Sequence, residues 1–522
     1  MAENYEKIGG PMVSVLVPTF NRPGYLALAL ESVLRQSYKN LQLIVINDGG
    51  TDVSDIIKSF DDSRLIFIDR KENRGKAFSL NEALAIAQGK YIAYLDDDDL
   101  YYPRHIETLV DALENQTDCQ VAYSDLYKVY CRVLRDGSRQ VLSKVVEISR
   151  DFDRFFMLYF NHALHVSVMH RRDMIEKTGP YNENLNIMID WDITRRLAFF
   201  SDFYHVCEIT GEFYSPIGEC DRISVQRRKD KNEYLRNVLA IRTTRPPKPW
   251  SKIKDLSIIF ASDKLDQQAG KTLGAVWRHT FYPYELYLPL PGGDFDRINT
   301  SMPNIVKVSV SPMASQTEKI DSALNKCGGE YVVILPSGFP VRDEWVELSL
   351  YAMINSSAAR EGFELADSTD ALWAAVVRKD DLLYARRSFP NLSMRESLRA
   401  AGIEIRRPKF EEMPFQFDNL LKEAQSAEKD GNWTKAARIF DCIAERYQNR
   451  IWMKTLAAKA FFKAGSHRVA AKLSSEINCC RPTVDTLLLE AKADMEDRKF
   501  DSAIELLKKA QDILEGSRLV WT

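Results

Sequence analysis

Apolar and polar positions alternate in blocks along the first hundred residues. Four short apolar runs end in polar residues: VSVLVPTF from Val13, LQLIVIND from Leu41, RLIFID from Arg64 and YIAYLDDDD from Tyr91. Between the first two, residues 23–36 carry apolar side chains at helical spacing. Strands that alternate with helices predict an α/β fold with a parallel sheet, which binds ligands at the carboxyl ends of its strands.

A second block repeats this pattern after the proline-rich stretch RPPKPW, residues 245–250, which is typical of a stiff linker. Residues 257–293 align with residues 14–50 at a constant offset of 243, and residues 322–335 align with residues 82–95 at an offset of 240. So long a fixed offset indicates an internal duplication. The alternative is a plain α/β domain without common origin, since any two strand–helix units look alike.

The last hundred residues show helical patterning throughout. Ala436, Ala470 and Ala503 hold the same place in three similar stretches, GNWTKAARIF, AGSHRVAAKL and DRKFDSAIELL, and are spaced by 34 and then 33 residues. This spacing is the period of tetratricopeptide helix–turn–helix repeats, and a plain helical bundle is the alternative. Stacked repeats leave a concave face, so a homo-oligomer or a protein partner is expected at this tail.

The composition sets broad limits on function. The chain has 522 residues with 45% hydrophobic and 28% charged residues, which suits a soluble protein of several domains. A net charge of -3 gives no basic field for nucleic acid. Eight scattered cysteines without a CxxC pair favour reduced, cytoplasmic usage. No run approaches the ~18 apolar residues of a membrane span, so any membrane contact would be peripheral.

The run Asp96-Asp97-Asp98-Asp99 is the first candidate for chemistry. It follows the apolar strand YIAYL directly. Adjacent carboxylates repel one another unless a cation compensates, and two or three such oxygens suit Mg²⁺ or Mn²⁺, ions that commonly bridge substrate phosphates. A solvated acidic turn is the simpler alternative, and the buried strand just before the run argues against it.

Polar residues also follow the first two strands. Asn21 lies in PTFNR, and Asp48 ends the second strand in VINDGG, where it could accept hydrogen bonds from a nucleobase. Arg74 and Lys76, in NRGKAFSLNEAL, could face phosphates at the start of a helix. Taken singly, NDGG is also a common turn and Asn73 a common helix cap.

Asp190 lies near the start of an amphipathic helix in MIDWDITRRLAFF. A carboxylate beside an aromatic side chain can serve as the general base for a sugar hydroxyl. The alternative is an acid that interacts with the helix dipole.

These pieces, in this order, resemble the family-2 glycosyltransferases of GT-A fold. The resemblance covers residues 13–224 and rests on VSVLVPTFNRPGYLALALESVLRQSY, LIVINDGGTD, NRGKAFSLNEALAIAQGKYIAYLDDDD and IDWDITRRL. It implies that Asp96 and Asp98 form a DxD motif, with Asp98 as the main metal ligand. It also implies Asp190 as the catalytic base, although Ile189 stands where the family usually has Glu. The donor-binding residues that it implies are Thr19, Asn21, Asp48, Arg74, Asp96 and Asp97.

The resemblance further implies a hexosyltransferase that uses a nucleotide-sugar donor such as a UDP-sugar. The acceptor would be a glycan, a lipid-linked sugar or a protein, in cell-surface polysaccharide or glycoconjugate synthesis. The expected reaction is a single displacement with inversion, helped by Mn²⁺ or Mg²⁺. A nucleotidyl- or phosphosugar transferase on the same fold and a non-catalytic scaffold are the alternatives.

The second copy lacks the residues that this chemistry needs. Pro291 stands where Asp48 stood, and Pro336-Ser337-Gly338 replace the first three aspartates of the acidic run. We therefore expect a catalytic GT-A domain over residues 1–245, a degenerate and non-catalytic GT-A-like domain over residues 250–410, and a tetratricopeptide-like helical domain over residues 415–522.

Overall fold

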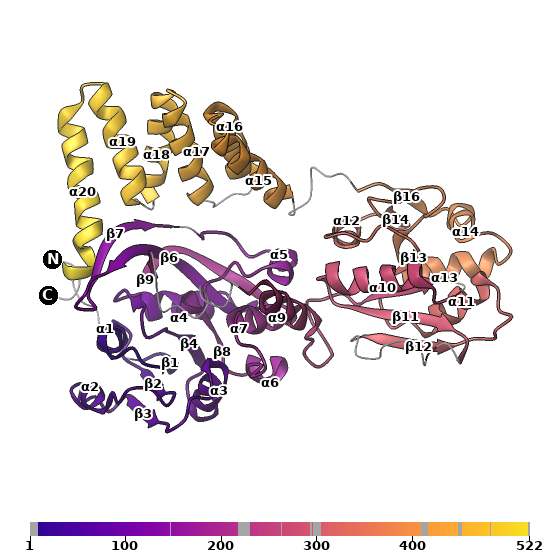
Figure 1. Cartoon of the computed structure of the whole chain (residues 1–522), viewed down its shortest axis with the longest axis horizontal. Coiled ribbons are helices and arrows are strands. Elements are labelled where there is room, and N and C mark those ends of the chain that lie inside the picture. Colours follow the sequence, from indigo (N-terminus) through magenta and orange to yellow (C-terminus); the bar gives the residue numbers. More distant parts are fainter. Residues whose placement is uncertain are drawn as a thin grey trace. The chain divides into compact units, whose positions relative to one another are not determined.

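The computed structural model describes residues 9–146, 148–217, 230–262, 264–292, 295, 304–408, 416–446, 451–480 and 482–519. By their contacts these residues form two compact units, Met1–Tyr234 with Phe417–Thr522, and Leu235–Gln416 (Figure 1). The helical tail thus belongs with the first sheet. The expected boundaries at residues 410 and 415 lie outside the described residues.

The first unit is built on a mixed sheet with the strand order β3-β2-β1-β4-β8-β6-β9-β5, with β7 paired to β6. The strands β3, β2, β1 and β4 run parallel, and β8 is antiparallel to β4. The strands are β1 (Val13–Thr19), β2 (Leu41–Asn47), β3 (Leu65–Asp69), β4 (Tyr91–Tyr94), β5 (Leu100–Tyr101), β6 (Cys119–Val133), β7 (Arg139–Val145), β8 (Val168–Arg171) and β9 (Asp202–Pro216). The predicted parallel α/β arrangement is confirmed for β3, β2, β1 and β4, and the sheet continues with antiparallel pairs that the sequence did not predict.

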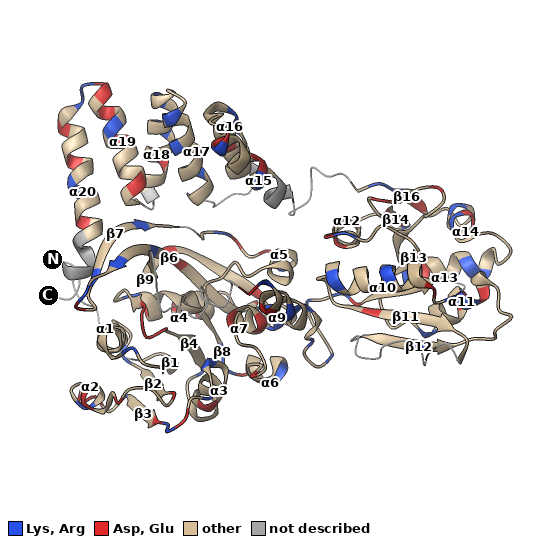
Figure 2. Cartoon of the chain, viewed as in Figure 1, with Lys and Arg blue, Asp and Glu red and all other residues tan. Residues whose placement is uncertain are grey.

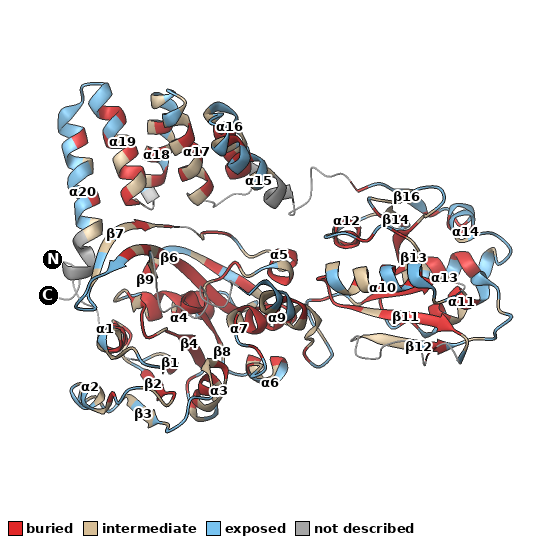
Figure 3. Cartoon of the chain, in the orientation of Figure 1, coloured by how far each residue is buried: buried red, intermediate tan, exposed pale blue. Residues whose placement is uncertain are grey.

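Helices fill the connections between these strands. They are α1 (Pro23–Leu34), α2 (Ser54–Lys58), α3 (Lys76–Ile86), α4 (His105–Asn115), α5 (Arg154–Tyr159), α6 (Met174–Thr178) and α7 (Ile189–Leu197), with a 3₁₀ turn η1 (His165–Ser167). Pro23 opens α1 at a position where its missing N–H is not needed. The strands β1, β2 and β4 are buried almost throughout, as the uninterrupted apolar runs predict (Figure 3).

The second unit repeats the beginning of this topology. Its sheet has the order β12-β11-β10-β13-β15-β14-β16, in which β12, β11, β10 and β13 run parallel and β15 is antiparallel to β13. Its strands are β10 (Leu256–Ala261), β11 (Tyr284–Leu290), β12 (Ile305–Ser309), β13 (Tyr331–Pro336), β14 (Glu361–Glu364), β15 (Ala375–Arg378) and β16 (Glu404–Arg406). Its helices are α10 (Gln267–His279), α11 (Gln316–Lys326), α12 (Glu347–Asn355), α13 (Lys379–Ser388) and α14 (Met394–Ala400), and α9 (Lys231–Thr243) precedes the sheet.

The two sheets also share their strand register. Val13 lies opposite Leu41 in the first sheet, and Leu256 lies opposite Tyr284 in the second, so the aligned positions pair identically. Gly89 and Gly329 occupy equivalent positions, because the backbone N–H of each donates a hydrogen bond to the hydroxyl of a serine on the first strand of its sheet. The predicted second sheet is therefore present, with the pairing that the sequence offset implies.

The C-terminal helices stack in sequence order, each in contact with the next from α16 onward (Figure 1). They are α15 (Gln416–Lys429), α16 (Trp433–Arg446), α17 (Ile451–Lys463), α18 (His467–Cys480), α19 (Val484–Glu496) and α20 (Phe500–Leu519). Left-handed residues recur just before α16, α18 and α20, at Gly431 (φ 71°), Gly465 (φ 79°) and Arg498 (φ 62°). The helical tail is confirmed, and this recurrence is compatible with helix–turn–helix repeats.

The tail contacts strands of the first sheet and the helix α5. The Tyr127 hydroxyl on β6 donates a 2.7 Å hydrogen bond to the carbonyl of Pro482, and Ile513 of α20 packs on an apolar cluster around Tyr127 and Val129. Phe156 of α5 belongs to the core formed by α15, α16 and α17. Among the described helices, none combines the length and apolar character needed to cross a bilayer.

Candidate active site

The candidate site lies at the carboxyl ends of β1, β2 and β4. Thr19 pairs with Asn47 at the ends of β1 and β2, and β4 runs parallel to β1 on its other side. The loops that follow these strands therefore begin at one edge of the sheet, and they carry Asn21, Asp48 and the acidic run.

Asp48 is buried and has three polar partners. Its carboxylate accepts hydrogen bonds from the backbone N–H groups of Arg74 (2.9 Å) and Gly75 (2.8 Å) and pairs with the Arg70 guanidinium at 2.8 Å. Gly49 has φ 69°, and a Cβ there would lie 2.4 Å from the backbone of Glu72. The NDGG sequence therefore brings the β2 loop against the loop before α3, with Asp48 joining the two.

The four aspartates of the acidic run face different partners. Asp96 pairs with the Lys76 ammonium at 2.5 Å, and Asp97 accepts a 2.8 Å hydrogen bond from the Thr19 hydroxyl. Asp98 pairs with Arg22 at 3.0 Å, while Asp99 accepts the backbone N–H of Tyr214 at 2.8 Å. Asp97, Asp98 and Asp99 are all buried. The run is thus no solvated surface turn.

Two arginines that the sequence analysis did not single out reach the acidic run. Arg22 lies 3.4 Å from the Asp97 carboxylate as well as 3.0 Å from that of Asp98. Arg139, at the start of β7, donates to the Asp98 carbonyl at 2.7 Å, and its guanidinium stacks on the Tyr25 ring of α1. Arg22 could have been found as the neighbour of Asn21, whereas no local pattern marks Arg139.

Burial and charge perturb the titration of these groups. Burial, followed by the charge of Asp98, raises the pKa of Asp97 to about 7. For Lys76, burial lowers the pKa, but the carboxylates of Asp96, Asp190 and Asp98 outweigh it and raise the pKa overall. The charges of Asp190 and of the acidic run therefore both act on the Lys76 ammonium, although Asp190 lies far away in the sequence.

Asp190 occupies the first turn of α7, as the pattern predicts. Its carboxylate is half-buried and accepts a 3.1 Å hydrogen bond from the Asn161 side-chain amide, a residue that the sequence analysis missed. Asp192 has a different role, because it forms a buried ion pair with Arg196 at 2.6 Å. Arg196 also donates to the carbonyl groups of Thr178 and Gly179. Asp190 is thus the carboxylate of this helix that is left with solvent access.

The other predicted donor residues have defined places. Thr19 is buried beneath Asp97, whereas Asn21, with φ 59°, accepts the backbone N–H of Thr51 at 2.9 Å and so ties the β1 and β2 loops together. The Arg74 side chain is exposed and stacks on Phe78, with 3.4 Å from its guanidinium carbon to the ring centre. Their contacts with a donor stay predictions.

The acidic run fits a divalent cation by its donor chemistry. Among the described residues, carboxylate oxygens of Asp96, Asp98 and Asp99 lie within 4.8 Å of one another. These oxygens are the hard ligands that Mg²⁺ and Mn²⁺ prefer. Asp96 and Asp98 are the two ligands that the resemblance implies, and Asp99 accepts the backbone N–H of Tyr214 on β9.

Among the residues that the structure describes, the equivalent edge of the second sheet carries no such cluster. Pro291 follows β11 with no acceptor side chain, and Gly338, with φ 87°, donates its N–H to the Thr272 hydroxyl. A Cβ at Gly338 would lie 2.2 Å from the side chain of Gln268. The space that the acidic run occupies in the first sheet is here closed by local contacts.

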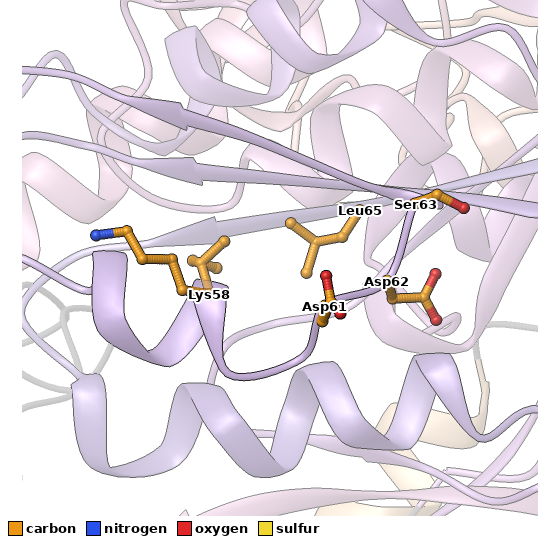
Figure 4. Close-up of a pocket in the computed structure, with 6 residues that line it drawn as sticks. Lys58, Asp61, Asp62, Ser63 and Leu65 are labelled. Atoms are coloured by element: carbon orange, nitrogen blue, oxygen red, sulfur yellow. The ribbon is translucent and has the colours of Figure 1, made fainter.

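An open hollow in the first unit lies elsewhere. It is lined by residues of α2 and of the turn to β3, including Lys58, Asp61, Asp62 and Leu65 (Figure 4). None of the candidate site residues lines it. Its lining is a surface turn with mixed charges, and no catalytic arrangement is visible there.

Comparison with known proteins agrees with this geometry. Residues 14–179 match the family model described as glycosyl transferase family 2. An uncharacterized glycosyltransferase of Methanocaldococcus jannaschii is 32% identical over 189 residues, which cover 35% of this chain and 63% of that protein. One of Rickettsia prowazekii is 29% identical over 211 residues, covering 39% of this chain and 64% of that protein. The chain thus spans less than two thirds of the length of these curated relatives.

Solved structures give weaker matches. S. aureus TarS 1-349 in complex with UDP is 17% identical, with coverage of 45% of this chain and 66% of that chain and a TM-score of 0.34. The mannosyltransferase PcManGT from Pyrobaculum calidifontis, in complex with GDP-Man and Mn²⁺, is 19% identical with a TM-score of 0.32 and covers 45% of this chain and 66% of that chain. The family match and the curated relatives support a glycosyltransferase in the first part of the chain.

Proposed function

We propose that the chain is a metal-dependent glycosyltransferase that moves a sugar from a nucleoside-diphosphate sugar to a hydroxyl group, with inversion. The observation that carries this proposal is the acidic run, in which carboxylate oxygens of Asp96, Asp98 and Asp99 lie within 4.8 Å of one another. The Lys76 ammonium pairs with Asp96 at 2.5 Å, and the half-buried Asp190 in the first turn of α7 is the candidate base.

The donor would enter at the carboxyl ends of β1 and β2. Asp48, Thr19, Asn21 and Arg74 would line its nucleotide end, and Asp96 to Asp98 its diphosphate end. Asp48 is pre-oriented by three hydrogen-bond and ion-pair partners, so a nucleobase must use an oxygen lone pair that these contacts leave. Arg22 and Lys76 supply positive charge beside the diphosphate position.

Asp96 and Asp98 would hold the cation. When bound, Mn²⁺ or Mg²⁺ neutralises charge on the departing nucleoside diphosphate. Asp190 accepts the proton of the acceptor hydroxyl, which makes its oxygen the nucleophile at the anomeric carbon. The Asn161 amide holds the Asp190 carboxylate in one orientation during this step.

The acceptor we propose is a glycan, a lipid-linked sugar or a protein, in cell-surface polysaccharide or glycoconjugate synthesis. The half-buried position of Asp190, above a buried helix face, suits a hydroxyl on a large acceptor that approaches from solvent. The second α/β unit would be a degenerate, non-catalytic GT-A-like domain, since Pro291, Ser337 and Gly338 offer no carboxylate.

A thermal-shift screen of nucleotide sugars, each with and without Mn²⁺, tests donor binding. A ligand that binds only the native state raises the melting temperature by mass action. We expect a metal-dependent rise with at least one nucleotide sugar, and the loss of that rise in Asp98→Ala. A scaffold would show no shift with any donor in the panel.

The tetratricopeptide-like tail supports a second proposal, a homodimer formed through α20. Phe500, Ile504 and Leu507 form an exposed apolar stripe on α20, with 58%, 51% and 40% of each residue accessible. In an antiparallel pair, Asp501 would lie opposite Lys508 of the partner subunit, so the charges beside the stripe are self-complementary.

Sedimentation velocity tests this dimer. The Ile504→Ser variant should shift the chain toward the monomer, whereas Val469→Ser, at an exposed apolar position of α18, should leave the wild-type mass unchanged. A wild-type chain that is monomeric at micromolar concentration would contradict the proposal.

A further inference from the structure

A second group of metal-ligating side chains lies on β9, apart from the acidic run. His205 and Cys207 are two residues apart on this strand, and the segment before α5 brings Asp151 beside them. Among the described residues, Asp151, His205 and Cys207 each offer a ligand atom, and these atoms lie within 4.8 Å of one another. The proposed transfer reaction uses none of the three.

The strand is irregular at this point. Ser124 of β6 lies opposite Val206 and Asp125 lies opposite Ile209, so Cys207 and Glu208 form a bulge in β9. Bulges re-aim side chains and recur beside functional sites. Here the bulged residue Cys207 turns its sulfur toward the Nδ1 atom of His205, at 3.7 Å.

The distances match the edges of a tetrahedral zinc site. Zinc–nitrogen, zinc–oxygen and zinc–sulfur bonds of the usual lengths require edges of about 3.4 Å between N and O and about 3.6 Å between N and S. Nδ1 of His205 lies 3.0 Å from the Asp151 carboxylate and 3.7 Å from the Cys207 sulfur. Side-chain shifts of a few tenths of an ångström therefore complete three of the four positions.

The rest of the histidine is arranged as in zinc proteins. The Nε2 atom of His205 contacts the buried Asp125 carboxylate at 2.8 Å, and the Ser149 hydroxyl donates to the other Asp125 oxygen at 2.9 Å. A carboxylate behind a ligating histidine fixes its tautomer and raises its basicity. The Tyr123 ring stacks on the imidazole with 4.8 Å between ring centres, which restricts its rotation.

The cysteine distinguishes a metal site from a buried imidazolium. The carboxylates of Asp125 at Nε2 and Asp151 at Nδ1 suffice by themselves to hold an imidazolium at His205. A thiolate beside Nδ1 is, in contrast, a preferred ligand of zinc.

We propose that Asp151, His205 Nδ1 and Cys207 Sγ bind a zinc ion, with water or a second Asp151 oxygen as the fourth ligand. The mixed N, O and S ligands select this ion over Mg²⁺ and Mn²⁺, which favour the all-oxygen acidic run. The ion would tie β9 to the segment that starts α5. Since Phe156 of α5 packs in the core of the helical tail, the site would stabilise the attachment of the tail.

Cobalt substitution of the full chain tests the site directly. With millimolar Mg²⁺ present to occupy the acidic run, Co²⁺ should give the intense visible bands of a tetrahedral complex and a thiolate-to-cobalt charge-transfer band. Cys207→Ser should lose the charge-transfer band. Cys479→Ser, which removes an exposed cysteine of α18, should keep it. A charge-transfer band that persists in Cys207→Ser would overturn the proposal.

Thiol protection gives a second readout that needs no variant. Stoichiometric Zn²⁺ should slow alkylation of Cys207 by iodoacetamide at least tenfold, as followed by peptide mass spectrometry, while the rate at Cys479 stays the same. Equal alkylation rates at Cys207 with and without Zn²⁺ would mean that no zinc binds there and would overturn the proposal.

Asp125→Asn should weaken zinc binding by about 10–100-fold, the range for partners of ligating histidines.

Discussion

Replacing Asp190 by Asn removes the proposed base and almost nothing else. The Asn161 amide, which donates to Asp190 at 3.1 Å, can donate equally to the carbonyl oxygen of an asparagine, so the side chain should keep its place. Loss of a general base lowers turnover by about 10²–10⁴-fold, equivalent to roughly 2.7–5.4 kcal/mol in activation free energy. Donor affinity should change little, because Asp190 lies outside the cation set of Asp96, Asp98 and Asp99.

A graded control separates chemistry from structure. Asn161→Ala removes one orienting hydrogen bond, worth about 1 kcal/mol, and should lower turnover only about fivefold. The loss of a charge from the first turn of α7 should change stability by less than about 1 kcal/mol. The assay is single-turnover sugar transfer with saturating donor. An Asp190→Asn enzyme with normal turnover, or one that loses donor binding instead, would refute the assignment.

Three further substitutions test other parts of the structure. Asp98→Ala should abolish sugar transfer and the metal-dependent part of donor binding. Full activity of the wild type in excess chelator would contradict this prediction. Lys144→Met should lower the free energy of unfolding of the first unit by about 3–5 kcal/mol in chemical denaturation, because the fully buried Glu212 carboxylate, 2.6 Å from Lys144, loses its cation. Adding Glu212→Gln should restore much of this loss, because it removes the unpaired charge. Arg498→Gly should raise the free energy of unfolding by roughly 0.5–1 kcal/mol, because Arg498 has a left-handed backbone that glycine adopts without strain, as it does at Gly431 and Gly465. A lower melting temperature in this variant would argue against equivalent repeats.

Local patterns predicted the elements whose burial is uniform. The apolar runs from Val13, Leu41 and Tyr91 form central strands that are covered on both faces. A strand covered on both faces can be apolar at every position, so an uninterrupted apolar run predicts it. The fixed offset between the halves predicted the second sheet, since an alignment without insertions preserves strand register.

Residues that reach the site from distant elements escaped prediction. Arg139 meets Asp98 because the β6–β7 hairpin brings it to α1, where it stacks on Tyr25, and no spacing in the sequence encodes that approach. Asn161 meets Asp190 in the same way, from the loop before η1. Sequence also left open which aspartates of the acidic run face inward, because this depends on hydrogen bonds from Thr19 and from the β9 backbone.

The most direct test of the central claim is the product formed from nucleotide sugars. The wild-type chain and Asp98→Ala are incubated with UDP- and GDP-sugars, Mn²⁺ and a mixture of glycan acceptors, and the nucleotide released is identified by mass spectrometry. The proposed chemistry predicts that the wild type releases a nucleoside diphosphate together with a glycosylated acceptor, and that Asp98→Ala releases neither. A nucleoside monophosphate would indicate phosphosugar transfer, and a sugar 1-phosphate would indicate nucleotidyl transfer. No product from any donor would indicate a scaffold. Each of these results would contradict the proposed sugar transfer.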